Sequence, residues 1–148
     1  MKKILCFILC LLSVSVSAQM LDLIGGGAIG GAMTKGSVNS VNRGINMLKY
    51  TQLVRSLTYS VNVIRINHMG NYARVSNSDI DKSSFYPYGA QAGSLGRDRF
   101  YIELTGLSDT ICKRFVSGDI TFNEIYINGH KGGSDLCSSS SKIKFIFN

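Results

Sequence analysis

The sequence lacks a hydrophobic run long enough to cross a membrane by itself. Its most apolar stretch, Ile4–Leu12, falls short of the roughly 20 residues that a bilayer requires. Two lysines precede this stretch and small residues follow it up to Ala18, which is the order of a secretory signal peptide. We therefore expect residues 1–18 to be a signal peptide that is cleaved after Ala18. If the leader is kept instead, residues 4–33 would form a membrane anchor.

Cysteine and histidine are scarce, with four and two residues respectively. Cys6 and Cys10 would leave with the leader, so the mature chain would keep only Cys112 and Cys137. Because an exported chain enters an oxidising compartment, we expect these two to form a disulfide. Together with His130 they would offer three zinc ligands at best, at a spacing that fits no common motif, which excludes a zinc site.

Acidic residues are also few. The chain has nine of them against sixteen lysines and arginines, and loss of the two leader lysines would lower the formal charge from +7 to +5. The basic residues are scattered singly or in pairs, so no run of them indicates a nucleic-acid-binding surface, and no nucleic-acid partner is expected. The mature chain has the size of one ordinary domain.

Residues 19–36 form an apolar arm that is rich in glycine and carries few charges. Glycines such as Gly26 and Gly30 recur at a spacing of four, which in a helix permits close approach of a second helix. The arm is shorter than a membrane span. Two interpretations therefore stay open: a flexible arm, or a segment that packs against another subunit or a membrane surface.

A helical period follows the arm. Apolar residues recur at steps of three and four, which predicts one long helix over Ser37–Ile66. Ser37 or Ser40 could cap its start and Gly70 could end it. The second half is rich in β-branched residues, so a strand there is an alternative. The periodic positions are Val41, Ile45, Leu48, Val54, Leu57, Val61 and Ile64.

Residues 70–96 are polar, contain several glycines and hold the single proline, Pro87. This composition predicts a long irregular loop with short turns. Four aromatic side chains interrupt it, and we expect them to hold the loop against a core. These are Tyr72, Phe85, Tyr86 and Tyr88.

Three later runs alternate apolar with polar residues and predict strands of a small antiparallel sheet. In the first run, Phe100, Ile102 and Leu104 would share one face, and Tyr101 and Glu103 the other. The last run places Ile143, Phe145 and Phe147 in the same alternation. The three runs are Arg99–Leu104, Phe122–Gly129 and Lys142–Asn148.

A short helix is predicted between the first two strands. Ser108 or Asp109 could cap it, and Ile111, Phe115 and Val116 would point inward. The complete order of elements indicates an α+β domain over residues 37–148. In this domain a long N-terminal helix packs on a small antiparallel sheet, and a disulfide staples a C-terminal loop.

The histidines and aspartates do not have the spacing of a catalytic site. His68 stands at the end of the predicted helix, where an imidazole interacts favourably with the helix dipole. His130 falls in a turn and is interpreted as a solvated residue. Asp79 and Asp81 lie two apart in the predicted loop.

The remaining candidate groups are isolated. Glu103 and Glu124 are separate strand residues, and Glu103 could stand opposite a basic neighbour. The predicted disulfide leaves no thiol nucleophile. The glycines of "GGGAIGG" lack the lysine and Ser/Thr of a phosphate-binding loop. We therefore expect no enzymatic activity, no metal and no cofactor.

The order of motifs near the C-terminus carries a resemblance to a known family. "IELTGLSDTICKRFVSG", "NEIYING" and "CSSSSKIKFIFN" follow one another, and "GNYARVSNSDIDKSSFYP" precedes them. In this order they resemble the soluble part of type IVb pilins, including the thin-pilus pilins of conjugative plasmids and the toxin-coregulated type. The resemblance covers Ser37–Asn148. An ordinary secretory signal peptide stands where those pilins have a prepilin leader.

The resemblance implies which surfaces are exposed. The disulfide-bounded segment, Lys113–Leu136, would face outward from a fibre, as it does in that family. The long helix would contact the sheet through one apolar face. The residues implied for that contact are Val41, Ile45, Leu48, Val54 and Leu57.

The function expected from the resemblance is that of a non-enzymatic, exported pilin-like protein of a type IV pilus, secretion or conjugation system. It would be a minor or tip subunit, or a soluble accessory, that contacts pilin or secretion-system proteins in the periplasm, at the cell surface or outside the cell. An edge position of Lys142–Asn148 would allow docking by strand addition. The alternative is a secreted adhesin or colonisation-type binding module that is independent of a pilus.

Overall fold

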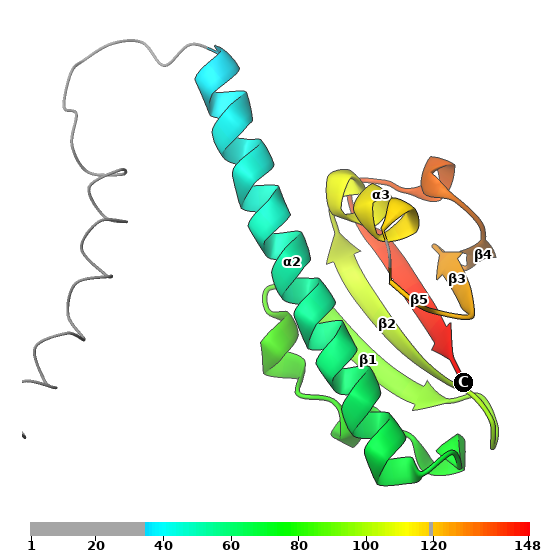
Figure 1. The fold of residues 1–148 in the computed structure, drawn as a ribbon. Coiled ribbons are helices and arrows are strands. Elements are labelled where there is room, and N and C mark those ends of the chain that lie inside the picture. The colour runs from blue at the N-terminus through cyan, green and yellow to red at the C-terminus, as the bar shows by residue number, and fades with distance from the viewer. Residues whose placement is uncertain (1–34, 119) are drawn as a thin grey trace, which may run out of the picture. The chain divides into compact units, whose positions relative to one another are not determined.

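The computed structural model describes residues 35–118 and 120–148 (Figure 1). The predicted signal peptide, residues 1–18, and nearly all of the predicted arm, residues 19–36, lie outside the described residues. The described part has an α+β fold in which one helix packs on a five-stranded antiparallel sheet. Within these residues, no helix is both long enough and apolar enough to span a membrane.

Helix α2, Lys35–His68, is the helix that the apolar period predicts. Its second half is helical, so the alternative of a strand there is wrong. The helix ends where two residues take positive φ angles, 47° at Met69 and 81° at Gly70. Glycine adopts this conformation at little cost, as expected for a residue just past a helix end.

The packed face of α2 belongs to its second half. Leu53, Leu57, Val61 and Ile64 are buried in the hydrophobic core. Their spacing of three and four residues places them on one side of the helix. The β-branched residues of this segment favour a strand, but the segment is helical because of its packing. An amphipathic face buried on a sheet stabilises a helix more than intrinsic propensity does.

The implied contact of Val41, Ile45 and Leu48 with the sheet is wrong. These side chains are 57, 43 and 73% exposed, whereas Val54 is half-buried and Leu57 is buried. At 100° per residue the three lie about 80–140° around the helix from Leu53. In addition, the first turns of α2 extend beyond the sheet (Figure 1).

The five strands follow the order β1-β2-β5-β3-β4 in the sheet. The predicted edge position of the last strand is therefore wrong, because β5 lies between β2 and β3. Phe145, for example, pairs with Ile102 of β2 on one side and with Ile125 of β3 on the other. The strands are β1 Gly89–Ser94, β2 Phe100–Leu107, β3 Glu124–Ile127, β4 His130–Lys131 and β5 Ser141–Phe147.

Strand β1 lies inside the segment that was expected to be an irregular loop, and this expectation is wrong for residues 89–94. The sequence "GAQAGS" has no bulky alternating residues, so it carries no strand signal of its own. It pairs with β2 along its whole length. Gly93 lies opposite Tyr101, and a Cβ there would come within 2.7 Å of the Tyr101 ring.

The rest of the predicted loop forms three short 3₁₀ turns. Of its aromatic residues, Tyr72 and Phe85 are buried and Tyr88 is half-buried against the core, as expected. Tyr86 is exposed, so its predicted packing is wrong. The turns are η1 Tyr72–Arg74, η2 Asn77–Asp79 and η3 Lys82–Phe85.

The inner face of the sheet is apolar, as the alternation predicts. The six predicted side chains of β2 and β5 are buried between the sheet and the helices. Helix α3, Asp109–Ser117, covers one end of the sheet, and the Ile111 backbone N–H donates to the Ser108 hydroxyl that caps it. Tyr50 of α2 packs edge-on against Phe115 of α3, with ring centroids 5.1 Å apart.

Candidate functional site

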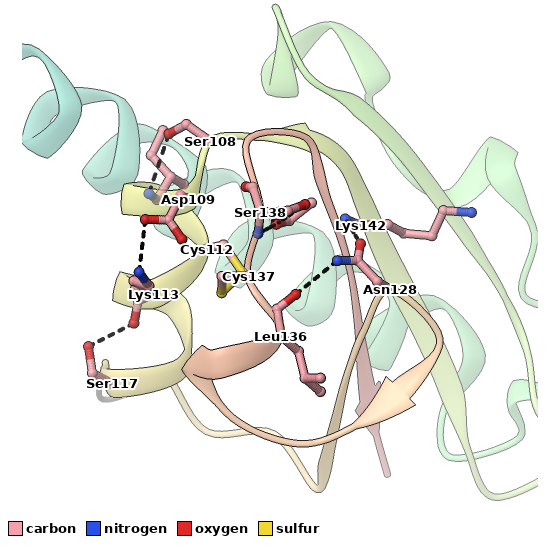
Figure 2. The surroundings of a disulfide bond; sticks show 12 residues. Ser108, Asp109, Cys112, Lys113, Ser117, Asn128, Leu136, Cys137, Ser138 and Lys142 are labelled. Atoms are coloured by element: carbon pink, nitrogen blue, oxygen red, sulfur yellow. Dashed lines mark hydrogen bonds and ion pairs between the residues drawn. A yellow bond between two sulfur atoms is a disulfide. The ribbon is translucent and has the colours of Figure 1, made fainter.

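The predicted Cys112–Cys137 disulfide is present (Figure 2). It joins α3 to the residue after the short turn η4, Ser134–Leu136, across a sequence separation of 25 residues. Cys112 is buried in the core and Cys137 packs against it. The bond therefore fixes both ends of the intervening segment to the folded domain.

A tight hairpin lies inside the stapled segment. Asn128 and Gly129 have φ angles of 52° and 90°, the conformation that favours Asn-Gly in a two-residue hairpin turn. The Asn128 side-chain amide donates to the Leu136 carbonyl, and its oxygen accepts from the Lys142 backbone N–H, both at 2.9 Å (Figure 2). One side chain thus ties the hairpin to η4 and to β5. His130 follows the turn and is exposed, as interpreted.

The outer face of the sheet, which points away from α2, carries polar side chains in cross-strand rows. Gln91, Glu103, Lys144 and Tyr126 lie side by side on four strands, because each is paired with the next in the ladder. Lys131 of β4 continues the row beside Tyr126. Five strands thus contribute neighbouring polar groups, although many of these residues are far apart in the chain.

A cleft of about 740 Å³ is hollowed into this face, a volume typical of ligand pockets in proteins. It is lined by charged groups around an apolar residue, Ile146, which is itself buried. The lining residues are Leu95, Arg99, Glu103, Glu124, Tyr126, Asn128, Gly129, Lys142, Lys144 and Ile146.

Glu103 is the buried carboxylate of the cleft. Its oxygens lie 3.6 Å from Lys142 Nζ and 3.5 Å from Lys144 Nζ, and the Gln91 side-chain amide donates to it. The predicted basic neighbour is therefore present, and it is Lys144 of the adjacent strand. Lys144 also lies over the Tyr101 ring, 4.6 Å from its centroid. These partners compensate the cost of burying a charge.

Glu124 is the second carboxylate. It accepts from Lys131 Nζ at 3.0 Å and from the Tyr126 hydroxyl at 3.0 Å, and Arg99 Nη1 lies 3.4 Å away. The hydrogen bond from Lys131, followed by that from Tyr126, lowers the pKa of the Glu124 carboxyl. The same contact raises the pKa of Lys131, so this pair stays ionised over a wider pH range than either group alone.

The charges of this face do not balance. Four cations, Arg99, Lys131, Lys142 and Lys144, surround two carboxylates. The carboxylate side chains are 6 and 25% exposed, whereas the cationic side chains are 36–64% exposed. A molecule that approaches this face therefore meets positive charge first.

The other candidate groups from the sequence have structural contacts. His68 Nε2 lies 3.0 Å from Asp79 Oδ1, which ties the end of α2 to η2. Asp79 also accepts from the Ser76 backbone N–H, and Asp81 caps η3 by accepting from Ser83. Among the described residues, no group of three or more His, Cys, Asp and Glu side chains is placed to hold a metal ion.

Sequence reasoning missed the cleft as a site. The alternation correctly places Glu103 and Lys144 on a face opposite the core, and the same phase applies to Glu124 and Tyr126. What it lacks is the strand order, because β5 was expected at an edge. Only a central β5 brings lysines from the end of the chain between two strands that carry glutamates.

No protein-family model matches this sequence, and no curated protein is significantly similar to it.

Proposed function

We propose that this chain is an exported, non-enzymatic, pilin-like protein of a type IV pilus, secretion or conjugation system. It acts by protein–protein contact, as a minor or tip subunit or as a soluble accessory. The α+β fold, with one helix on an antiparallel sheet and a stapled C-terminal segment, is consistent with this proposal. The disulfide itself is typical of proteins in oxidising compartments outside the cytoplasm.

The observation that carries the proposal is an exposed apolar stripe on α2. Val41, Ile45 and Leu48 lie on one side of the helix, away from the sheet. Farther along the helix, Tyr59 and Ile66 are 68 and 70% exposed, and the helical repeat places them on that same side. Large apolar side chains exposed along one side of a helix favour contact with another protein.

The stripe suits a helix or apolar groove of a pilin or secretion-system protein. Side chains at steps of three and four are the anchors with which an amphipathic helix docks into such a groove. The protruding first turns of α2 would enter the partner, while the sheet and the disulfide-bounded segment stay accessible. Membrane contact of the glycine-rich arm, residues 19–36, would add to this docking.

A site-specific cross-linking experiment tests the proposal. A photoreactive amino acid replaces Leu48 in one variant and Met47 in the control, and both proteins are produced in cells that contain the natural partners. Both side chains are exposed, but neighbouring residues of a helix point about 100° apart. We expect the Leu48 probe to cross-link to pilin or secretion-system proteins, identified by mass spectrometry, and the Met47 probe to do so far less.

A second variant, Leu48→Asp, should abolish co-purification of the same partner while Met47→Asp preserves it. Equal cross-linking from both positions would contradict the proposed stripe. Cross-linking of Leu48 only to proteins unrelated to pili or secretion would favour the alternative function of an independent adhesin.

A further inference from the structure

We propose that the charged cleft on the outer face of the sheet binds an acidic, extended peptide segment of another protein. This inference is separate from the docking of α2, because the cleft and the apolar stripe lie on different elements. It is argued from the positive charge of the cleft, from its apolar lining and from the spacing of its lysines along β5.

The accessible charge of the cleft is positive. Lys142 and Lys144 share the single buried carboxylate of Glu103, and Arg99 and Lys131 share Glu124. An ammonium group has three donors, so each lysine keeps hydrogen-bonding capacity beyond its ion pair. The cations are also more exposed than the carboxylates they accompany. An incoming carboxylate can therefore bind them without first displacing the internal pairs.

The spacing of the cations favours a peptide over a single small anion. Lys142 and Lys144 are two residues apart on β5 and face the same side of the sheet, as does Ile146. Residues two apart in a strand are separated by about 6.6 Å. An extended peptide presents its alternate side chains at the same interval, so two of its acidic side chains match two lysines.

The apolar lining and the length of the cleft indicate which other residues the peptide contains and how long it is. Ile146 forms an apolar floor and Leu95 an apolar wall, which suits an apolar residue beside the acidic ones. From Lys142 to Ile146 the strand rises about 13 Å, the length of four to five extended residues. The ligand class is thus a short segment in which glutamate or aspartate recurs at alternate positions.

Binding of a labelled peptide tests the proposal with the purified chain. The probe is fluorescein-labelled Glu-Leu-Glu-Leu-Glu, and the control peptide replaces each glutamate by glutamine. We expect fluorescence anisotropy to give an affinity for the acidic peptide roughly tenfold higher than for the neutral one, decreasing with salt. A single-stranded oligothymidylate, which carries negative charge at a different spacing, should compete poorly.

Variants locate the contact. Arg99→Gln with Lys142→Gln should lower the affinity for the acidic peptide by about tenfold. The matched control, Lys49→Gln with Lys113→Gln, removes the same charge from exposed positions on α2 and α3 and should change the affinity less than about twofold. Because Lys142 partners a buried carboxylate, Arg99→Gln alone serves as a second variant whose folding is not at risk.

Three results would overturn the proposal. They are equal affinity for the acidic and neutral peptides, equal loss of affinity in the cleft and control variants, and effective competition by the oligothymidylate. The last two would indicate general attraction of a basic protein for polyanions rather than a site. None of these outcomes bears on the cross-linking of Leu48, so the two proposals can fail separately.

Discussion

At the scale of single residues, Asp79 links two parts of the chain, the end of α2 and the turn η2. Its carboxylate accepts from His68 at the end of α2 and from the Ser76 backbone N–H at the start of η2. Burial by itself would raise the pKa of the Asp79 carboxyl. The hydrogen bonds from His68 and Ser76 outweigh burial and lower this pKa below its ordinary value of 3.8. The charged form is therefore favoured by folding.

This shift predicts how stability depends on pH. A carboxyl with a depressed pKa in the folded state stabilises the fold fully above its unfolded pKa, and this stabilisation is lost as the pH falls through the folded pKa. We expect Asp79→Asn to lower the free energy of unfolding by about 1 kcal/mol at pH 6, a typical value for a capping contact. The difference from the wild type should shrink below pH 3.8.

Urea unfolding at a series of pH values, followed by circular dichroism, measures this difference. Asp98→Asn is the control, since Asp98 is an exposed aspartate, and its effect should be small throughout. A difference between Asp79→Asn and the wild type that stays constant from pH 6 to pH 3 would show that the charge of Asp79 is not the source of the stabilisation.

At the scale of elements, α2 is one continuous helix with two physical roles. Its second half buries Leu53, Leu57 and Ile64 against the sheet. Its first half exposes Ile45 and Leu48. Burial of apolar surface, at roughly 25 cal/mol per Å², dominates stabilisation, so the buried side chains of the second half stabilise the fold far more than the exposed Ile45 and Leu48 do.

Two leucines of this helix should therefore respond differently to the same substitution. Leu57→Ala leaves a cavity in a closed core and should lower the free energy of unfolding by about 2–5 kcal/mol. Leu48→Ala should lower it by less than about 0.5 kcal/mol. Chemical denaturation of both variants measures the contrast. A large loss in Leu48→Ala would mean that its side chain is covered within the chain, which would remove the basis of the proposed docking stripe.

At the scale of the whole molecule, the disulfide joins helix α3 to the residues just before the last strand, β5. Cys112 is in α3, and Cys137 stands shortly before β5. The segment between them holds β3, β4 and the Asn128 turn. These are short strands, so the covalent bond limits how far the segment can separate from the sheet. On the chain-entropy model a closed loop of this length stabilises a fold by about 3.5 kcal/mol.

Replacement of both cysteines, Cys112→Ser with Cys137→Ser, should lower the free energy of unfolding by about that amount. Reduction of the wild type by dithiothreitol should have the same effect, whereas the double variant should be insensitive to the reductant. Guanidinium unfolding with and without dithiothreitol measures both. If reduction leaves the midpoint unchanged, the folded contacts of Asn128 and the core hold the segment without the bond.

The helix, the short helix and three strands follow from local pattern, because each buries one face. That face is predicted directly by the apolar period of three and four over Ser37–Ile66 and by the alternation in Arg99–Leu104. Strand β1 does not, since its glycines lie against Tyr101 and Thr105 and its alanines give the core only small side chains. No local signal could reveal it, because its pairing with β2 creates its structure.

By itself the sequence determined the class of the fold, the phase of the inner face and the pairing of Cys112 with Cys137. These depend on residue type and on short-range period. Only the tertiary structure decided which apolar residues of α2 are covered and where β5 lies in the sheet. Both depend on contacts between distant segments: the sheet covers the side of α2 that carries Leu53 and Leu57, and the central position of β5 brings Lys144 between Glu103 and Tyr126.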